Sequence, residues 1–310
     1  MQIFHGYTGL PGSARGGVAA LGNFDGVHLG HQAVMAQAAA LAHALKAPPA
    51  AAVFSPHPRR IFQPGGEPFA LMSDSQRAKS LGEAGAELVH HIPFDRALAA
   101  MTPERFVAEV LDNGLGLKGV VTGTDFCFGK DRAGNAKALQ ALGAARGLTV
   151  AIAEPVSTQG QSGKISSSDV RQAVRAGDPA RAAGLLGRPF AIEGVVSQGD
   201  QRGRTLGFPT ANVALGDYVR PAFGVYAVHV DLGGGEAIPG VANIGRRPTV
   251  DGTQARLEAH LFDTNADLYG RVISCALIAF LRPEQRFEGL GALKAQIAAD
   301  CEAARRLLGA

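Results

Sequence analysis

The sequence predicts two domains: an α/β domain with a parallel sheet in residues 1–186, and a small antiparallel β-barrel with a C-terminal helix in residues 187–310. Three observations lead to this prediction. A chain of 310 residues is long enough for two hydrophobic cores. Strand-like and helical segments alternate through roughly residue 155, which is typical of a parallel sheet covered by helices. After Gly187, strand-like runs follow one another at short spacing, which favours an antiparallel sheet or barrel.

In the first domain, apolar runs predict strands at 17–21, 50–55, 86–94, 118–123 and 148–154. Helix formers at helical spacing predict helices at 31–46, 73–85, 102–114 and 135–147. Ser73 with Gln76 has capping-box spacing, and Thr102 followed by Pro103 suits an N-cap and the first helical position. Ligands of such sheets bind at the carboxyl ends of the strands, so the segments after the strands are expected to converge on one crevice.

In the second domain, strands are expected at 191–199, 255–263 and 271–282, with a hairpin over 224–245. The glycines at 233–235 predict the turn of that hairpin, because no helix follows that could make them a phosphate loop. Only the last segment, 290–308, has a clearly helical pattern. The change from alternating strands and helices to consecutive strands places the domain boundary near 183–190.

Composition and charge narrow the function classes only slightly. The formal net charge is +3, a mildly basic balance that suits an anionic small substrate as well as nucleic acid. Cys127, Cys275 and Cys301 lie far apart in the sequence, which favours free thiols in a reducing compartment. The sequence has no apolar run long enough to span a bilayer and no signal-peptide pattern, so we expect a cytoplasmic location.

The stretch LGNFDGVHLGH at 21–31 joins a predicted strand to a predicted helix. Gly22, Gly26 and Gly30 allow the backbone to turn tightly and to approach a ligand closely. The first helical turn offers free N–H groups and the positive end of the helix dipole, so His28 and His31 can direct both imidazoles at one phosphate. Either histidine alone would be interpreted as a surface residue; the strand–helix placement favours a phosphate site.

This stretch resembles the HxGH signature of the nucleotidylyltransferase superfamily and, as G-x-F-D-G-x-H-x-G-H, is similar to bacterial FAD synthetases. KISSSDVR at 164–171, TGTDFCFGK at 122–130 and FSPHP at 54–58 are similar to other segments of that family. Alone, KISSSDVR would be a serine-capped helix with an exposed arginine, and FSPHP would be a rigid turn with an exposed histidine.

The resemblance implies a Rossmann-like α/β nucleotidyltransferase fold and adenylyl transfer from ATP to FMN, giving FAD and pyrophosphate. It implies that His28, His31 and Arg171 neutralise charge during catalysis. It implies that nucleotide or flavin is bound by Gly22, Phe24, Asp25, Gly26, Gly30, Pro56, His57, Pro58, Asp125, Phe126, Phe128, Ser166, Ser167 and Ser168.

GDQRGRTLGFPTANV at 199–213 is a polar loop that contains three glycines. Its glycines alone would indicate only turns, and the order of residues is not that of a Walker A loop. The whole string resembles the riboflavin kinase motif G-x-x-x-G-R-x-L-G-F-P-T-A-N, and GVANIGRRPT at 240–249 and LEAHLFD at 257–263 are similar to downstream segments of that family. The resemblance implies that Mg²⁺ and ATP phosphates are held at Thr210 and Asn212. It implies substrate binding by Gly203, Arg204, Gly207, Pro209 and Arg247.

In the kinase family the glutamate of the E-x-H strand is the proposed base, which here is Glu258. It would accept the proton of the riboflavin 5′-hydroxyl as that oxygen attacks the γ-phosphate. The alternative is a strand carboxylate paired with Arg256 or Arg271. Arg282 and Glu284 are expected to be structural.

Both motif sets occur in one chain in the order of bacterial bifunctional riboflavin kinases/FAD synthetases. The resemblance implies ATP, riboflavin and FMN as substrates, Mg²⁺ as cofactor, and no nucleic-acid or membrane partner; weak self-association is left open. One alternative is an enzyme that keeps only one activity. Another is a nucleic-acid-binding protein, but no basic stripe with interleaved aromatic residues supports it. Val250 departs from the kinase motif, which usually has an aromatic residue there.

Overall fold

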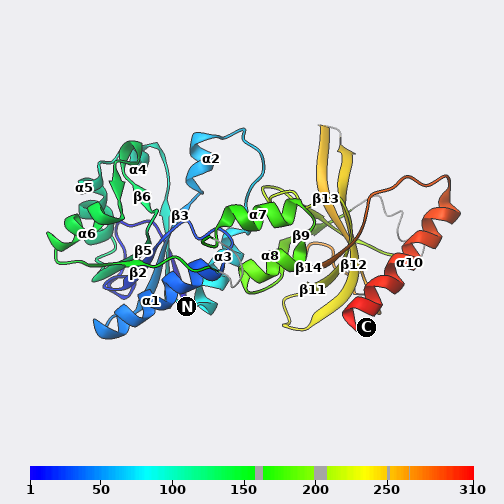
Figure 1. The fold of residues 1–310 in the computed structure, drawn as a ribbon, viewed down its shortest axis with the longest axis horizontal. Coiled ribbons are helices and arrows are strands. Elements are labelled where there is room, and N and C mark those ends of the chain that lie inside the picture. Colours follow the sequence, from blue (N-terminus) through cyan, green and yellow to red (C-terminus); the bar gives the residue numbers. More distant parts are fainter. Residues whose placement is uncertain (158–162, 199–207, 250–251, 265) are drawn as a thin grey trace. The chain divides into compact units, whose positions relative to one another are not determined.

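The computed structural model describes residues 1–157, 163–198, 208–249, 252–264 and 266–310, and it separates into two compact units (Figure 1). The first unit contains Met1–Glu67 and Asp74–Ser166, and the second contains Pro68–Ser73 and Ser167–Ala310. Helices α7 (Ser167–Arg175) and α8 (Pro179–Leu186) therefore belong to the second unit. The domain boundary that the sequence predicts at residue 187 stays a prediction.

The first unit contains a parallel sheet with strand order β1-β4-β3-β2-β5-β8. Its strands are β1 (Gln2–His5), β2 (Val18–Gly22), β3 (Pro49–Ser55), β4 (Leu88–Pro93), β5 (Gly119–Gly123) and β8 (Thr149–Ala153). The chain runs from β2 through β3 to β4 on one side and then to β5 and β8 on the other, so the switch point of the sheet lies between β2 and β5. The predicted parallel sheet is confirmed. Strand β1 was not predicted, because it is short and mostly exposed.

Helices cover both faces of this sheet. The helices of this unit are η1 (Gly12–Ala14), α1 (Leu29–Ala44), α2 (Pro58–Phe62), α3 (Asp74–Glu83), α4 (Arg96–Ala99), α5 (Pro103–Arg105), η2 (Phe106–Asp112), η3 (Lys130–Arg132) and α6 (Ala136–Ala144). Strands β6 (Cys127–Phe128) and β7 (Gly134–Asn135) form a separate antiparallel pair. The predicted helix at 102–114 begins as expected, with Thr102 accepting from the Arg105 N–H at 3.3 Å. It then continues as a π-helix, whose wider turn buries Phe106, Val107, Val110 and Leu111 together.

The second unit is built on a closed antiparallel barrel with strand order β10-β13-β12-β11-β14-β9. Its strands are β9 (Phe190–Ser197), β10 (Ala211–Ala214), β11 (Gly224–Asp231), β12 (Ala237–Thr249), β13 (Gly252–Leu261) and β14 (Val272–Pro283). The predicted turn between β11 and β12 is confirmed, with the Gly233 N–H donating to Asp231 Oδ1 at 2.7 Å. Helix α10 (Leu290–Leu308) has the bounds that the sequence predicts and packs on β11, β12 and β14.

Residues 68–73 leave the first unit and pack into the second. The N–H groups of Phe69 and Ala70 both donate to the Asp217 carbonyl, at 3.0 and 2.9 Å, and the Val219 N–H donates to the Ala70 carbonyl at 2.8 Å. Phe69 and Leu71 are buried. The second unit is therefore assembled from two separate stretches of sequence.

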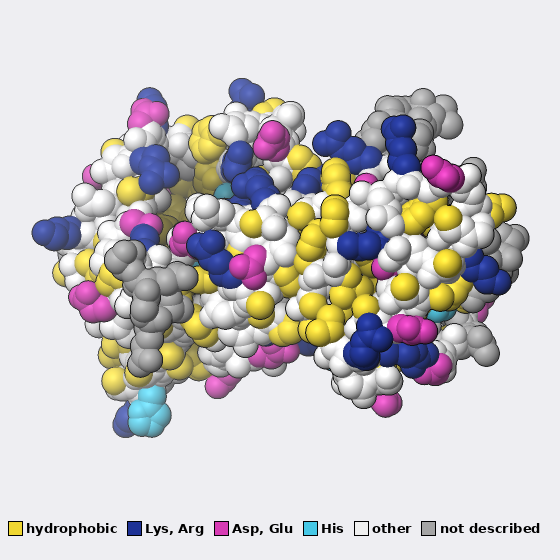
Figure 2. All heavy atoms as spheres, turned by 45° about the vertical axis from the view of Figure 1, so that its right-hand side comes forward, with side chains coloured by type: hydrophobic (Ala, Val, Ile, Leu, Met, Phe, Trp, Pro, Cys, Tyr) yellow, Lys and Arg dark blue, Asp and Glu magenta, His cyan; other side chains and the backbone are white. Residues whose placement is uncertain are grey.

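The described helices include none that is both long and apolar enough to cross a membrane. The three cysteines are free thiols. On the face drawn in Figure 2, Lys and Arg side chains are interspersed with Asp and Glu.

Candidate functional site

The loop between β2 and α1 has a strained backbone. Phe24, Gly26 and Val27 have φ angles of 51°, 90° and 40°. A positive φ is unusual for any residue except glycine and is most unfavourable for a β-branched side chain such as Val27, where it costs about 1–3 kcal/mol. The burial of Phe24 and Val27 holds the loop in this form. Such strain is concentrated at ligand-binding loops.

His28 caps helix α1 with its own imidazole. The His31 N–H donates to His28 Nδ1 at 3.3 Å, and the two rings stack with centroids 3.6 Å apart and planes 16° from parallel. Because Nδ1 is an acceptor, His28 in this arrangement is a neutral imidazole that carries its proton on Nε2. Only 5% of His28 is exposed. The structure thus presents a single ring N–H donor from His28 at the start of α1.

Close packing explains two of the glycines in the motif. A Cβ at Gly30 would lie 3.1 Å from Cε1 of His28 and 3.4 Å from the Ile165 carbonyl oxygen. A Cβ at Gly22 would lie 3.2 Å from the Phe24 ring. Gly26 is required for a different reason, its positive φ.

The segments after β2 and β5 and the residues before α7 meet in the first unit, as the sequence predicts for the carboxyl edge of a parallel sheet. Thr122 Oγ1 donates to the Leu21 carbonyl at 3.1 Å and joins the ends of β5 and β2. Lys164 Nζ lies 2.6 Å from Asp125 Oδ2, and this hydrogen-bonded ion pair lowers the pKa of Asp125. Lys164, which directly precedes the ISSS string, is therefore a functional candidate that sequence reasoning missed.

The aromatic pair after β5 is partly structural. The rings of Phe126 and Phe128 stack with centroids 5.7 Å apart, and Phe128 also packs on Phe106 at 5.4 Å. Phe128 is buried in the main core cluster, whereas Phe126 is only partly buried against it. Phe126 is therefore the more accessible member of the pair.

The segment after β3 forms a capped helix start. The Ser55–Pro56 peptide is cis, and Pro58 begins α2. His57 Nδ1 accepts from the Arg59 N–H at 3.1 Å, so this histidine also caps a helix with its imidazole.

The serine string lies where the sequence places it, at the start of a helix. Helix α7 begins at Ser167, and Ser166 is the last residue of the first unit. Arg171, one turn into α7, donates from Nε to the Phe69 carbonyl at 2.7 Å, and its guanidinium carbon lies 5.4 Å from the centre of the Phe69 ring. The second unit therefore orients this arginine.

A buried arginine that the motifs did not reveal supports the phosphate loop. Arg77 of α3 is 4% exposed; it donates from Nη1 to the Asn23 carbonyl at 3.2 Å and from Nη2 to Asp74 Oδ1 at 2.7 Å. Burial lowers the pKa of Arg77, and the nearby carboxylates of Asp74 and Asp25 oppose that shift. No residue pattern near Arg77 indicates this role, because its partners are distant in sequence.

In the barrel, three polar residues lie opposite one another on adjacent strands. Glu258 of β13 pairs in register with Asn212 of β10 on one side and with Asn243 of β12 on the other. Directly paired residues in a sheet share a face, so the three side chains project to the same side. Asn212 is 7% exposed and donates from Nδ2 to the Thr210 carbonyl at 3.4 Å. Pro209 contributes its carbonyl oxygen, 2.9 Å from His260 Nδ1.

The alternative interpretation of Glu258, an ion pair with Arg256 or Arg271, stays a prediction. Arg256 donates to Gln254 Oε1 at 3.2 and 3.3 Å. Arg271 donates to the Leu232 carbonyl at 3.1 Å.

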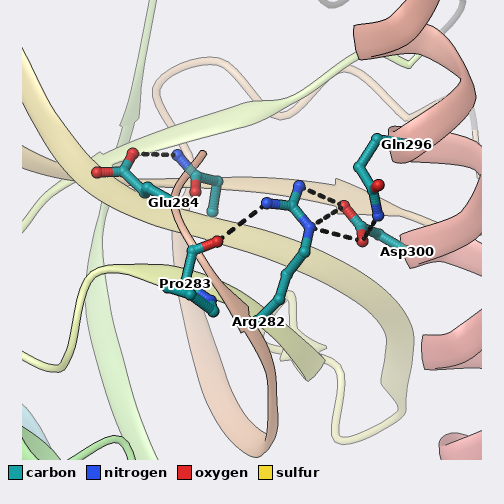
Figure 3. A network of polar contacts seen from close by, with 6 residues as sticks. Arg282, Pro283, Glu284, Gln296 and Asp300 are labelled. Carbon is teal, nitrogen blue, oxygen red and sulfur yellow. Dashed lines mark hydrogen bonds and ion pairs between the residues drawn. The ribbon is translucent and has the colours of Figure 1, made fainter. Parts of the chain in front are cut away.

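The end of β14 carries a polar network that attaches α10 to the barrel (Figure 3). Arg282 donates from Nε and Nη2 to both oxygens of Asp300, at 2.7–3.1 Å, and Gln296 donates to Asp300 Oδ1 at 2.9 Å. Glu284 Oε1 accepts from Asn243 Nδ2 at 3.3 Å, which orients an amide beside Glu258. Asn243 is the barrel-site residue that sequence reasoning missed, although it lies within the NIGRRPT string.

Several predicted residues lie outside the described structure. Gly203, Arg204, Gly207 and Val250 are not among the described residues, and of Arg247 only the backbone is described, paired with Gln254.

Comparisons with known proteins match both halves of the chain. A family model described as FAD synthetase matches residues 11–169, and one described as riboflavin kinase matches residues 186–308. The chain is 44% identical to the bifunctional riboflavin kinase/FMN adenylyltransferase of Pseudomonas fluorescens, over 99% of this chain and 98% of that protein. It is 42% identical to the protein of the same name from Escherichia coli K12, over 100% of this chain and 98% of the other.

One solved structure is similar over nearly the whole chain. It is a crystal structure of a protein described as a macrolide-efflux protein from Streptococcus pneumoniae. The TM-score is 0.84 and the sequence identity is 31%, covering 98% of each chain.

Proposed function

The chain belongs to the family of bifunctional riboflavin kinases/FMN adenylyltransferases, and from this premise we propose which of its residues carry each reaction. The enzyme phosphorylates riboflavin with ATP to give FMN, and it transfers the adenylyl group of a second ATP to FMN to give FAD and pyrophosphate. We assign adenylyl transfer to the loop around His28 and phosphoryl transfer to the barrel face around Glu258.

In adenylyl transfer, a phosphate oxygen of FMN attacks the α-phosphorus of ATP. The bond from that phosphorus to the bridging oxygen breaks, and its electron pair leaves with pyrophosphate. The attacking oxygen is already ionised, so the site needs no general base, and catalysis depends on alignment and on stabilisation of the charge that develops.

The observation that carries this assignment is the bond from the His31 N–H to His28 Nδ1. It fixes the His28 Nε2–H as a donor, which we propose is directed at the phosphates. His31, Ser166, Ser167, Ser168 and Arg171 would supply the other donors, with Phe69 orienting the arginine. One such donor contributes about 2–4 kcal/mol to transition-state stabilisation.

In phosphoryl transfer, the nucleophile is a neutral alcohol that must lose a proton as it attacks. We propose that Glu258 accepts this proton from the riboflavin 5′-hydroxyl while the oxygen bonds to the γ-phosphorus of ATP, and ADP leaves. Asn243, oriented by Glu284, would position the carboxylate or the substrate from the neighbouring strand.

The donor set opposite Glu258 fits Mg²⁺. Thr210 and Asn212 offer neutral oxygens, and the bond from Asn212 Nδ2 to the Thr210 carbonyl leaves the amide oxygen as the ligand atom. The described residues include no group of three or more His, Cys, Asp or Glu that could hold a metal, which suits an ion held mainly by ATP phosphates. When bound, Mg²⁺ would neutralise phosphate charge.

We further propose a cytoplasmic location, supported by the free cysteines scattered along the chain. The partners would be the small-molecule substrates and neither nucleic acid nor membrane. The mixture of charges on the face in Figure 2 supports this proposal.

The test follows riboflavin plus ATP by chromatography. His28→Ala should stop at FMN, and Glu258→Ala should form no FMN from riboflavin but still convert supplied FMN to FAD. His43→Ala and Glu236→Ala, at exposed positions of the same two units, are matched controls and should complete both steps. If either site variant abolished both steps while remaining folded, the two-site assignment would be wrong.

A further inference from the structure

The first unit contains a cavity of about 630 Å³ between α3 and the β1 edge of the sheet. His5 of β1 pairs in register with His91 of β4, and His91 pairs in turn with Val53 of β3. Val53 lies two residues before Ser55 in the same strand. Residues two apart in a strand share a face, so Ile3, His5, His91 and Ser55 all face α3. The helix side of the cavity is formed by Asp74, Ser75, Ala78, Lys79 and Gly82.

Small side chains keep this space open. Ala78 on the helix and Ser55 on the sheet leave it unfilled, and its volume lies within the range of small-molecule sites. Two lining residues, Met1 and Ile3, are 58% and 44% exposed, so the cavity has an apolar wall that the described protein does not cover. A ligand with an apolar body would remove this surface from water.

His91 is one of the residues that line the cavity. His91 is 6% exposed, and its Nε2 has no hydrogen-bond partner among the described residues. Leaving such a group unsatisfied costs about 1–3 kcal/mol. Burial and the nearby Arg77 lower the pKa of His91, so the ring is a neutral donor or acceptor rather than a cation. His5 packs edge-on against it, with ring centroids 5.1 Å apart.

The charges around the cavity favour an anion at its mouth. The Asp74 carboxylate is already compensated, by Arg77 Nη2 at 2.7 Å and by the Ser55 hydroxyl at 2.6 Å. Lys79 is exposed one turn further along the helix and makes no salt bridge within the described part of the chain. The net local charge is therefore positive.

We propose that this cavity is a further ligand site, separate from both catalytic sites, for a phosphorylated ring compound of mononucleotide size. The phosphate lies at Lys79 and His5, and the ring packs between Ile3 and Ala78 beside His91. Two kinds of molecule have this chemistry: a flavin nucleotide, which the enzyme makes, and an adenine nucleotide, which it consumes.

The test uses the full chain with ¹⁵N-labelled histidine, because nine histidines give few and well-separated NMR signals. Signals of His5 and His91 are assigned with His5→Gln and His91→Gln. FMN alone, AMP alone and inorganic phosphate alone are then titrated, so that no turnover occurs. We expect saturable shifts of the His5 and His91 signals with FMN or with AMP, and the responding nucleotide identifies the source.

Two variants and one control sharpen the result. Lys79→Ala should weaken this binding by about tenfold or more, and Ala78→Leu should abolish it by filling the cavity. Lys137→Ala, an exposed lysine on α6, should change nothing.

The proposal is overturned if neither nucleotide shifts the two signals, or if Lys79→Ala binds as tightly as the unmodified chain. It is also overturned if inorganic phosphate saturates the shifts at the same concentration, because that would show an anion site without a ring site. The chromatographic assay of the two reactions is independent of all these outcomes.

Discussion

The two proposed catalytic sites place their reactive side chains on different kinds of backbone. His28 lies at the N-terminus of α1, behind a loop with positive φ at three positions. Glu258 lies in the middle of a regular strand, where the barrel register sets it between two asparagines. This difference matches the two nucleophiles: an ionised phosphate needs donors, which a helix start supplies, and a neutral alcohol needs a base, which a strand carboxylate supplies. The protonation state of the nucleophile thus accounts for the kind of site.

The largest effect should come from removing the proposed base, Glu258. Glu258→Gln keeps the size of the side chain and its place in the register but cannot accept a proton. We expect FMN formation to fall by about 10²–10⁴-fold, while adenylation of supplied FMN is unchanged. The two rates are measured separately with riboflavin and with FMN as substrate. An equal loss in both rates would contradict the assignment of the two reactions to two separate sites.

The next effect tests whether the imidazole of His28 does more than cap the helix. Asn is a good N-cap residue, so His28→Asn should preserve α1 but remove the Nε2–H donor. We expect FAD formation to fall by about 10²–10³-fold with a nearly unchanged melting temperature. If His28→Asn retained full activity, the cap alone would be the function of this histidine.

A third change asks whether the barrel depends on its attached helix. Asp300→Ala leaves the guanidinium of Arg282, which is 18% exposed, without its carboxylate partner. Breaking a pair of this kind should lower the free energy of unfolding by about 3 kcal/mol. Urea unfolding of the full chain measures the loss. Arg306→Ala, on the same helix, is the control, and a loss as large in the control would contradict the role of the pair.

The smallest effect that we expect is a loss of folding stability at low pH. His90 in β4 is fully buried, and burial lowers its pKa from 6.5 to about 4. The unfolded chain therefore binds a proton more readily, so stability is lost as the pH falls from 6.5 toward 4. By pH 5 the loss from this group should be about 2 kcal/mol. Urea unfolding at pH 7 and pH 5 measures it, and His90→Leu should reduce the difference; an unchanged difference would contradict the assignment.

The elements that periodicity marks strongly were predicted well. The helix at 290–308 and the strands between β2 and β8 follow from apolar spacing, and the turn at 233–235 follows from its glycines. Strand β1 lacks a long apolar run, and the π-helix over Phe106–Asp112 has the same spacing of apolar residues as an α-helix, so neither could be predicted.

At the sites, residue types were predictable but tertiary partners were not. The motif singled out His28 and His31, yet an imidazole is not among the usual N-cap side chains, so the cap was unforeseen. Arg77 meets Asn23 more than fifty residues away, and Asn243 meets Glu284 about forty residues away. Such contacts leave no local pattern in the sequence.

The excursion of residues 68–73 into the second unit has a consequence for synthesis on the ribosome. Phe69 and Leu71 leave the exit tunnel long before Asp217 and Val219, the residues that receive this segment. At usual elongation rates the delay is roughly 8–30 s. During that time the first unit can close its sheet, while this segment remains an exposed apolar loop. The order of translation therefore makes the first unit the first to fold. The second unit can be completed only with a segment that was synthesised long before the rest of it.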